Sequence, residues 1–433
     1  MRTPLPVTGL SGSGAGRPEE VGTARLVSTV ESGFWTEVDS MNAARKVVVF
    51  FGTRAEAIKI APVVRELDSR TGLSVMTVAY CVERTLLEAE IADLDLTIDK
   101  YVACDIAQET SAVASARLIE AADRAIEAIC PDLVVIQGDT NSAFATAVAA
   151  QSRRVPVVHI EAGLRMSHDG EPRPDEINRR LIAQLANLHL APTPLCWSNL
   201  VREGVDGTNI FVVGNTTVDV LRWAIACDVE IDDPGLSNAV GASAGVVLVN
   251  VHRAESWGGP LDRIAAAVSQ LARRWTRVPF VVVLHDNDEG PNALAPALRH
   301  LPNVVLTSPL AYLEFTHVMK HARLILTDSG GVQVEAAALN IPTLVVRESS
   351  ERDEGLSSNI ATLVGTDIGS IVATASKVGV VRPGPANVIA CEFGDGQAAR
   401  RSADAMLWFL HRGVRPSNYL APPSPSLRGL RAA

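Results

Sequence analysis

The chain has 433 residues, of which 47% are hydrophobic, 20% charged and 4% aromatic, and its formal net charge is −10. This composition is globular, and the length favours two domains over one. The acidic balance argues against a general nucleic-acid binder or a protein of anionic membrane surfaces. A local concentration of cations would still allow an anionic ligand to bind.

The cysteines and the apolar segments indicate a reducing compartment. None of the six cysteines lies at C-x-x-C spacing, so we expect neither a zinc site nor a redox pair, and we predict no metal and no cofactor. Residues 1–45 lack the apolar segment of a signal peptide, and no stretch approaches the ~20 apolar residues of a membrane span. We therefore predict a cytoplasmic protein with no membrane partner.

Short apolar runs alternate with helical patterns between two irregular ends. Residues 1–45, rich in Gly, Ser, Pro and Thr, are expected to be a disordered extension, and the Pro-rich tail 412–433 is expected to lack order. The predicted strands are 46–51, 73–80, 132–137, 155–160, 245–251, 279–285, 303–307, 323–327 and 342–346. Helical patterns follow near Ala55, at 121–129, at 142–151 and from Leu261.

Continuous apolar strands separated by helices are typical of parallel sheets that are covered on both faces. Two such series predict an α/β protein with two doubly wound, Rossmann-like domains facing a cleft. We expect the first domain at 46–220 and the second at 221–385, with the junction near Gly214–Asn238. A C-terminal helix within 386–411 is expected to pack back on the first domain.

Ligands of open α/β sheets bind beyond the carboxyl ends of the strands, where this chain carries polar residues. In the first domain, Arg54 and Lys59 follow FGT at a helix start, where free backbone N–H groups favour an anion. About half of such turns are only structural, so the two cations count only if they face the cleft. Arg165 and Arg179 lie close to later strand ends and would orient carboxylates or bind phosphate.

Three carboxylates belong to the same region of the first domain. Asp139 follows QG, Glu161 follows HI, and Asp175 starts a helix in PRPDEINRR. Each of them taken alone is more often a helix cap or a solvated group. Three carboxylates at adjacent strand ends would, however, crowd one site and shift one another's pKa, as acid/base chemistry requires.

The second domain contributes a histidine, a glycine turn and further arginines. His252 follows a strand, although a lone histidine is more often a packed or surface residue. Ser329, Gly330 and Gly331 expose backbone N–H groups at a helix start, which suits a diphosphate, and Arg352 follows the last strand. No Walker A or G-x-G-x-x-G motif is present, so ATP and NAD are not favoured. The pattern favours a nucleotide sugar.

Taken together, these motifs resemble the non-hydrolysing bacterial UDP-N-acetylglucosamine 2-epimerase family across about residues 46–411. The motifs in chain order are FGTRAEAIKIAP, QGDT, HIEAGLR, PDEINR, GNTTVD, VHRAES, YLEF, LTDSGGVQVEA, SSER and FGDGQA. The resemblance implies a glycosyltransferase-B-like fold, usually in a homodimer. It also implies interconversion of UDP-N-acetylglucosamine and UDP-N-acetylmannosamine, without a metal or nicotinamide, through elimination of UDP to 2-acetamidoglucal and re-addition.

The resemblance also implies a role for individual residues of this chain. It assigns acid/base chemistry to the carboxylates Asp139, Glu161 and Asp175, and assistance of the leaving phosphate to His252. The residues implied in substrate binding are Arg54, Lys59, Arg179, His285, Phe315, Ser329, Gly330, Gly331, Glu335 and Arg352. Among them, Phe315 would contact uracil and Glu335 the ribose hydroxyls.

Five features depart from the family pattern. Cys81–Arg84 reads CVER where the family carries Gln-His-Arg of an activating site, so we expect weak or absent activation by substrate. Leu310 replaces a glutamine, and Asp353 replaces a proline. Residues 285–289 read HDNDE in place of His-x-Asn-Pro-Asn, and Asp175 is usually glutamate. The added negative charges point to a modified substrate or a specialised biosynthetic pathway.

Other activities share these motifs. A hydrolysing relative would stop after elimination and release UDP and N-acetylmannosamine, and most of its motifs would be the same. A retaining glycosyltransferase of the same fold would need an acceptor site, for which no residues are identified. A non-catalytic nucleotide-sugar binding protein would not need Asp139, Glu161 and His252.

Overall fold

The computed structural model describes residues 44–81, 87–88, 91–104, 106, 109–166, 174–253, 256–285, 294–352, 355, 360–379 and 389–421. Residues 45–433 form one compact unit, and all features below belong to it. The predicted extension 1–45 lies outside the described residues, except for Ala44 and for Arg45, which begins the first strand. The two sheets lie within one unit, so the boundary between two domains near residue 220 stays a prediction.

A seven-stranded parallel sheet builds the first half of this unit, which we call the first lobe. Its strands are β1 Arg45–Phe51, β2 Leu73–Cys81, β3 Lys100–Ala103, β4 Leu133–Gln137, β5 Val157–Ile160, β6 Leu188–Ala191 and β7 Ile210–Val212. Its helices are α2 Arg54–Asp68, η1 Ala92–Leu94, α4 Ser111–Ile129, α5 Asn141–Ser152, α6 Pro174–Leu185, α7 Pro194–Arg202, η2 Gly207–Asn209 and α8 Thr216–Ala224. The strand order is β3-β2-β1-β4-β5-β6-β7.

A six-stranded parallel sheet of order β10-β9-β8-β11-β12-β13 builds the second lobe. Its strands are β8 Val246–Asn250, β9 Phe280–Val283, β10 Val304–Thr307, β11 Ala322–Thr327, β12 Thr343–Val345 and β13 Ala361–Leu363. The helices after α8 are α9 Pro234–Val240, α10 Gly259–Arg274, α11 Leu294–Leu298, α12 Tyr312–Lys320, α13 Gly330–Ala338, α15 Ile368–Val378 and α16 Ala398–Phe409. The two parallel sheets with alternating helices confirm the predicted fold class.

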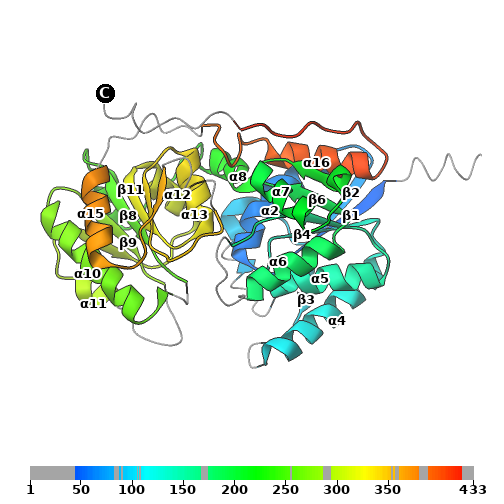
Figure 1. Cartoon of the computed structure of the whole chain (residues 1–433), viewed down its shortest axis with the longest axis horizontal. Helices are drawn as coiled ribbons and strands as arrows, with labels where there is room; N and C mark the ends of the chain where they lie inside the picture. The colour runs from blue at the N-terminus through cyan, green and yellow to red at the C-terminus, as the bar shows by residue number, and fades with distance from the viewer. Residues whose placement is uncertain are drawn as a thin grey trace, which may run out of the picture. The chain divides into compact units, whose positions relative to one another are not determined.

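Both faces of each sheet are covered by helices (Figure 1). Successive residues of a strand point to opposite faces, and in β1 they enter two different cores. Val47 and Val49 pack with residues of α2 and α16, whereas Val48 and Phe50 pack with residues of α4 and α5. This double burial is the reason why the strands read as unbroken apolar runs.

The order of each sheet reverses beside its first strand, between β1 and β4 in the first lobe and between β8 and β11 in the second. Strand ends diverge at such a switch point, which leaves a crevice for ligands. The four loops after these strands contain FGTR, QGDT, VHR and TDSGG. The chain therefore concentrates its polar motifs at the two switch points.

The described C-terminal residues return to the first lobe. Helix α16 packs against α2, α8 and β6. Residues 412–421 form no helix or strand but are tied to the edge strand β7, because Tyr419 N donates to Val212 O at 2.7 Å and Val212 N donates to Asn418 Oδ1 at 2.9 Å. The expectation of an unordered tail is therefore wrong for this part.

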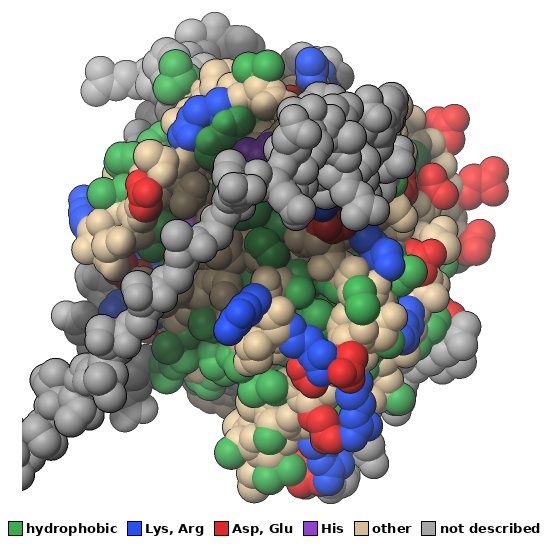
Figure 2. Space-filling model, turned by 90° about the vertical axis from the view of Figure 1, so that its right-hand side faces the viewer, with side chains coloured by type: hydrophobic (Ala, Val, Ile, Leu, Met, Phe, Trp, Pro, Cys, Tyr) green, Lys and Arg blue, Asp and Glu red, His purple; other side chains and the backbone are tan. Residues whose placement is uncertain are grey.

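Charged side chains of both signs lie next to one another on the first-lobe face shown in Figure 2. Ion pairs also join neighbouring helices of the first lobe; for example, Arg153, directly after α5, pairs with Asp123 of α4 at 2.5 Å. Within the described ranges, no helix is long and apolar enough to cross a membrane.

The turn after β5 requires a glycine at position 163. Gly163 has φ +91°, and a Cβ there would lie 2.3 Å from the main-chain oxygen of Cys196. We expect Gly163→Ala to lower the free energy of unfolding by about 2–4 kcal/mol, from backbone strain plus overpacking. Gly204 is the matched control, because it has φ +86° and a Cβ there would meet no described atom within 4 Å. Urea denaturation should give a clearly smaller loss for Gly204→Ala, and equal losses would contradict the steric argument.

Candidate active site

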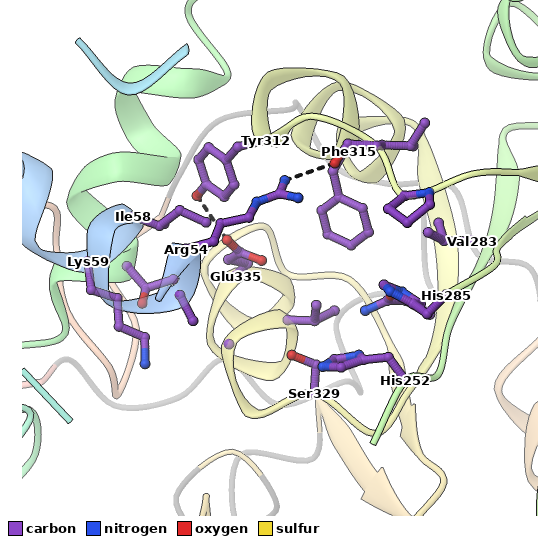
Figure 3. A pocket seen from close by; sticks show the side chains of 17 residues that line it. Arg54, Ile58, Lys59, His252, Val283, His285, Tyr312, Phe315, Ser329 and Glu335 are labelled. Atoms are coloured by element: carbon purple, nitrogen blue, oxygen red, sulfur yellow. Dashed lines mark hydrogen bonds between the residues drawn. The ribbon is translucent and has the colours of Figure 1, made fainter. Parts of the chain in front are cut away.

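A cavity of about 400 Å³ opens between the carboxyl ends of the two sheets (Figure 3). Residues of both lobes line it. Eight residues of the predicted site are among them: Arg54, Lys59, His252, His285, Phe315, Ser329, Gly331 and Glu335. The predicted substrate-binding residues are thus largely brought to one cavity.

The start of α2 is held rigidly at one end of this cavity. Glu56 accepts hydrogen bonds from Gly52 N and Thr53 N, both at 2.8 Å, and from Thr140 Oγ1 at 2.6 Å. Burial raises the pKa of Glu56 although these donors oppose the shift. A Cβ on Gly52 would lie 2.7 Å from Ser142 Oγ, so the close approach of the β1 and β4 loops needs glycine there.

Arg54 reaches from α2 to the second lobe. Its NH2 group donates to the main-chain oxygen of Leu310 at 2.8 Å, and in Figure 3 its side chain extends towards Phe315. The guanidinium and the aromatic ring would flank a planar ligand group at this end of the cavity.

Tyr312 and Glu335 form a buried hydrogen-bonded pair in the cavity wall. Tyr312 OH donates to Glu335 Oε1 at 2.9 Å. Burial raises the pKa of Glu335 to about 7, although Tyr312, Lys59 and Arg54 act in the opposite direction. Helix α13 carries Glu335, which can accept hydrogen bonds from ligand hydroxyls.

The other end of the cavity gathers His252, His285 and Ser329 (Figure 3). The two imidazole centroids are 4.9 Å apart, and His285 Nε2 is 2.8 Å from Asn250 Oδ1. Asp328 is fully buried behind them and accepts from His252 N at 3.1 Å and Ser256 Oγ at 2.8 Å. Asp328 therefore fixes the loop after β8, and its carboxylate lies 3.5 Å from His252 Nδ1.

The first turn of α13 is suited to an anion. No side chain of the described residues caps this helix at Ser329, so its first N–H groups are available to a ligand. Gly330 is required at the turn, because a Cβ there would lie 2.5 Å from Glu351 Oε1. Ser329 and Gly331 line the cavity on either side of it.

Glu161 is the most constrained carboxylate of the site. It has φ +65°, which is unusual for a residue other than glycine, and only 7% of it is exposed. Its donors are Lys59 Nζ at 2.6 Å, Gln137 Nε2 at 2.6 Å, Asn215 Nδ2 at 2.9 Å and Arg352 NH2 at 2.5 Å.

Burial alone would raise the pKa of Glu161, but Lys59 and Arg352 outweigh it and hold the pKa well below the ordinary value. Such a carboxylate is ionised and weakly basic. These contacts favour a role in fixing two cations over one in exchanging protons. Because Lys59 and Arg352 come from different lobes, Glu161 also joins the lobes.

Asp139, Asp175 and Arg179 form a separate cluster at the ends of β4 and α6. Arg179 NH2 lies 2.6 Å from Asp139 Oδ2, and its NH1 lies 3.0 Å from Glu176 Oε2. Burial and the nearby Asp139 charge raise the pKa of Asp175, while Arg179 and Arg253 oppose the shift. One aspartate is thus ion-paired, and its neighbour holds a proton to higher pH, which is the arrangement of an acid/base pair.

The second lobe contributes a buried carboxylate with two arginine partners near this cluster. Glu351 pairs with Arg253 at 3.1 Å and Arg347 at 2.8 Å. Burial would raise the pKa of Glu351, but the surrounding arginines hold it well below the ordinary value. Glu351 is close enough to the first lobe that Arg179 and Asp175 interact with its charge.

Some residues of the sequence interpretation lie elsewhere. Arg165 forms an ion pair with Glu203, with Nε 2.7 Å from Oε1, and so does not orient the three carboxylates. The departures at Val82–Arg84, 286–289 and Asp353 lie outside the described residues, as does the side chain of Cys81. Across the described ranges, no cluster of His, Cys, Asp or Glu has a geometry that could hold a metal ion.

Three functional side chains were not singled out from the sequence: Gln137, Asn215 and Tyr312. Each belongs to a motif that was recognised, namely QGDT, GNTTVD and YLEF. Each donates a hydrogen bond to a buried carboxylate, Glu161 or Glu335. An amide or hydroxyl donor of this kind leaves no specific signal in a sequence, because its acceptor is distant along the chain.

Comparison with known proteins covers both lobes. A model of the family described as UDP-N-acetylglucosamine 2-epimerase matches residues 65–407. UDP-N-acetylglucosamine 2-epimerase of Yersinia pestis is 35% identical over 342 residues, 77% of this chain and 90% of the relative. UDP-GlcNAc 2-epimerase from Neisseria meningitidis, solved bound to UDP-GlcNAc, is 30% identical with a TM-score of 0.74 over 84% of this chain and 100% of that chain.

A more distant structure shares the fold alone. The lipopolysaccharide outer core galactosyltransferase WaaB has a TM-score of 0.51 at 15% identity, over 84% of this chain and 99% of that chain. Its likeness agrees with the two doubly wound sheets described above.

The buried Glu335 should make stability depend on pH. Its pKa of about 7 lies above the ordinary 4.5, so the stability that it contributes is complete below about pH 4.5 and is lost as pH rises through about 7. Over this pH range, we expect the free energy of unfolding of the wild type to fall by up to about 3 kcal/mol more than that of Glu335→Gln. Urea denaturation between pH 4.5 and 8 measures it, with the exposed Glu230→Gln as control. Parallel curves for the wild type and Glu335→Gln would contradict the shift.

Proposed function

The chain belongs to the UDP-N-acetylglucosamine 2-epimerase family, whose members are isomerases, and we propose that it interconverts UDP-N-acetylglucosamine and UDP-N-acetylmannosamine. The carrying observation is the cavity, which both lobes line: an uncapped helix start suited to an anion lies on one wall, and Lys59, the ion-pair partner of Glu161, lies on the other. A nucleotide sugar needs this combination of groups.

The nucleotide is assigned to the wall that the second lobe provides. Uracil lies against Phe315 near Arg54, and the ribose hydroxyls donate to Glu335. The diphosphate binds the N–H groups of Gly330 and Gly331 in the first turn of α13, the hydroxyl of Ser329 and the cationic side chain of Lys59; the N–H of Ser329 itself donates to Thr327 Oγ1 at 3.0 Å. Cavity lining supports this assignment, because Phe315, Glu335 and Ser329 line one cavity: in Figure 3, Phe315 lies in the upper part, Ser329 in the lower part and Glu335 to the left of both.

Epimerisation proceeds by elimination and re-addition. A base removes the proton from carbon 2, the bond between carbon 1 and the diphosphate oxygen breaks, and UDP leaves with the bond's electron pair. The product is 2-acetamidoglucal. A proton then returns to carbon 2 on the opposite face, and UDP re-adds at carbon 1. The reaction is balanced without an oxidant or reductant, and it needs one base and one acid on opposite faces of the sugar.

We assign the two proton-exchanging roles to Asp139 and Asp175. The Asp139 side chain is 26% exposed and pairs with Arg179, whereas Glu161 is buried between two cations, so Asp139 is the more accessible carboxylate for the role of base. Asp175 has a raised pKa and is available as the acid. The roles exchange in the reverse reaction. Its contacts give Glu161 a supporting role: it holds Lys59 and Arg352 beside the reacting groups.

His252 is assigned to the leaving diphosphate. It lies beside Ser329 at the end of the cavity, and the Asp328 carboxylate, 3.5 Å from its Nδ1, balances a positive charge on the ring. A homodimer, a cytoplasmic location and the weak activation by substrate are predictions that accompany this proposal.

Incubation with UDP-N-acetylglucosamine in deuterated water, followed by NMR, tests the reaction. We expect deuterium at carbon 2 in UDP-linked N-acetylglucosamine and N-acetylmannosamine, because the returning proton comes from solvent. Free UDP with free N-acetylmannosamine would indicate the hydrolysing reaction. Unchanged substrate would contradict both.

Two substitutions test the assigned groups. Asp139→Asn and His252→Ala should each lower kcat for epimerisation by about 100-fold or more, the usual effect of losing an acid/base or charge-stabilising group. Asp132→Asn is a matched control at the opposite end of β4, where Asp132 pairs with Arg45 at 2.8 Å. Its kcat should equal that of the wild type. Preserved exchange in either test variant would remove that residue from the mechanism.

A further inference from the structure

Helix α8 belongs to the cores of both lobes at once. Val220 and Ala224 pack in the first-lobe core with residues of α2 and α16. Val218 and Leu221, on another side of the same helix, pack in a second-lobe core with residues of α12 and α13. A movement of α8 would therefore disturb the packing of both lobes.

The C-terminal segment crosses between the lobes beside α8. Phe393 is fully buried in the second-lobe core that contains Val218, whereas Ala399 packs in the first-lobe core. The C-terminal segment contacts the start of α8 where it passes between the lobes. Asn215 N donates to Phe393 O at 2.6 Å, and a Cβ on Gly214 would lie 3.3 Å from Gly394 Cα. The GNTTVD and FGDGQA motifs thus meet at one point of the structure.

The Asp219 side chain of α8 hydrogen-bonds to the C-terminal segment next to this contact. Its Oδ2 accepts from Ala398 N at 3.1 Å and its Oδ1 from Ala399 N at 2.9 Å, so both oxygens hold the first turn of α16. A carboxylate at a helix N-terminus satisfies N–H groups that have no partner within the helix and interacts favourably with the helix dipole. Burial raises the pKa of Asp219 to about 7, although these two N–H donors oppose the shift. Helix α16 is therefore attached to α8 by two hydrogen bonds to the Asp219 carboxyl in addition to its packing.

The same turn of α8 reaches the active site. Asn215 Oδ1 accepts from Thr217 N at 2.9 Å and caps α8, while its Nδ2 donates to Glu161 Oε1 at 2.9 Å. Glu161 in turn holds Lys59, which lines the cavity, and Arg352 of the second lobe. An unbroken series of hydrogen bonds and one helical turn connects α16 with the cations of the site.

We propose that Asn215 and Asp219 are positioning residues for the epimerase reaction: they lock the crossing Phe393–Ala399 to α8 and thereby fix the Glu161 carboxylate that holds Lys59 and Arg352. The proposal rests on the proposed function for its kinetic readout. Glu161 needs such support because its φ of +65° is strained, and strained residues persist only where their surroundings hold them.

Two substitutions at Asn215 separate this role from simple helix capping. Serine retains the cap of α8 but cannot reach Glu161, whereas alanine loses both contacts. Loss of one hydrogen-bond donor to a buried carboxylate changes an equilibrium or rate constant by about 10- to 100-fold. We therefore expect Asn215→Ser and Asn215→Ala to lower kcat by a similar factor, about 10-fold or more, with the Kd for UDP within about twofold of the wild type. Wild-type kcat in Asn215→Ser would overturn the role of Asn215.

Asp219 is tested against another helix cap of the same chain. Asp367 accepts from Ser370 N at 2.8 Å and caps α15 in the second lobe, away from α8 and α16. Asp219→Asn keeps one acceptor oxygen for the two N–H groups of α16, and Asp219→Ala keeps neither. We expect kcat to fall several-fold in Asp219→Asn and further in Asp219→Ala, and to stay unchanged in Asp367→Asn. Equal kcat in the wild type and the folded Asp219→Asn variant would overturn the role of Asp219.

Hydrogen exchange tests the connection without relying on catalysis. The Ala162 amide donates to Leu190 O at 3.1 Å directly after Glu161 and reports on that turn. In Asp219→Asn, protection should fall about tenfold or more at Ala398 and Ala399 and also at Ala162, whereas Asp367→Asn should lose protection only in α15. Loss confined to α16 would show that Asp219 is a local cap and overturn the proposal. A wild type that exchanges no deuterium into substrate would contradict the proposed function and leave this comparison decisive for the connection.

Discussion

The site depends on one buried ion-pair network, in which the Glu161 carboxylate lies between Lys59 of the first lobe and Arg352 of the second. A carboxylate with 5% of its side chain exposed would be strongly unfavourable without such partners. Its partners are Lys59, Arg352 and the side-chain amides of Gln137 and Asn215. The same contacts hold the two cations in fixed positions. The orientation of the lobes and the charge of the cavity are therefore linked.

Net charge and local charge have opposite signs in this protein. The chain carries −10 overall, yet Arg54 and Lys59 line the cavity and Arg179, Arg253 and Arg352 lie beside it. Several of the neighbouring carboxylates are engaged in orienting these cations. An acidic protein can thus bind a diphosphate, because the potential inside a cleft is set by nearby groups and not by the net charge.

The sequence indicated which motifs contain functional residues, but the structure gives several residues of these motifs other contacts than expected. TDSGG was interpreted as an anion-binding turn, and the uncapped start of α13 agrees with that interpretation. Asp328 of the same motif instead fixes the loop after β8. Arg165 was grouped with the carboxylates but pairs with Glu203, and part of the Pro-rich tail binds β7. In each case the deciding partner is distant in the sequence.

The sequence by itself determined the two doubly wound sheets and the family, because a strand buried on both faces must be apolar throughout and the polar residues are left to its carboxyl end. Only the tertiary structure decided which carboxylates are charged. Glu161 pairs with Arg352, which lies 191 positions later in the sequence. Asp139, after β4, pairs with Arg179 of α6. A pKa follows from burial and from neighbours in space, so acid, base and positioning carboxylates become distinguishable only after folding.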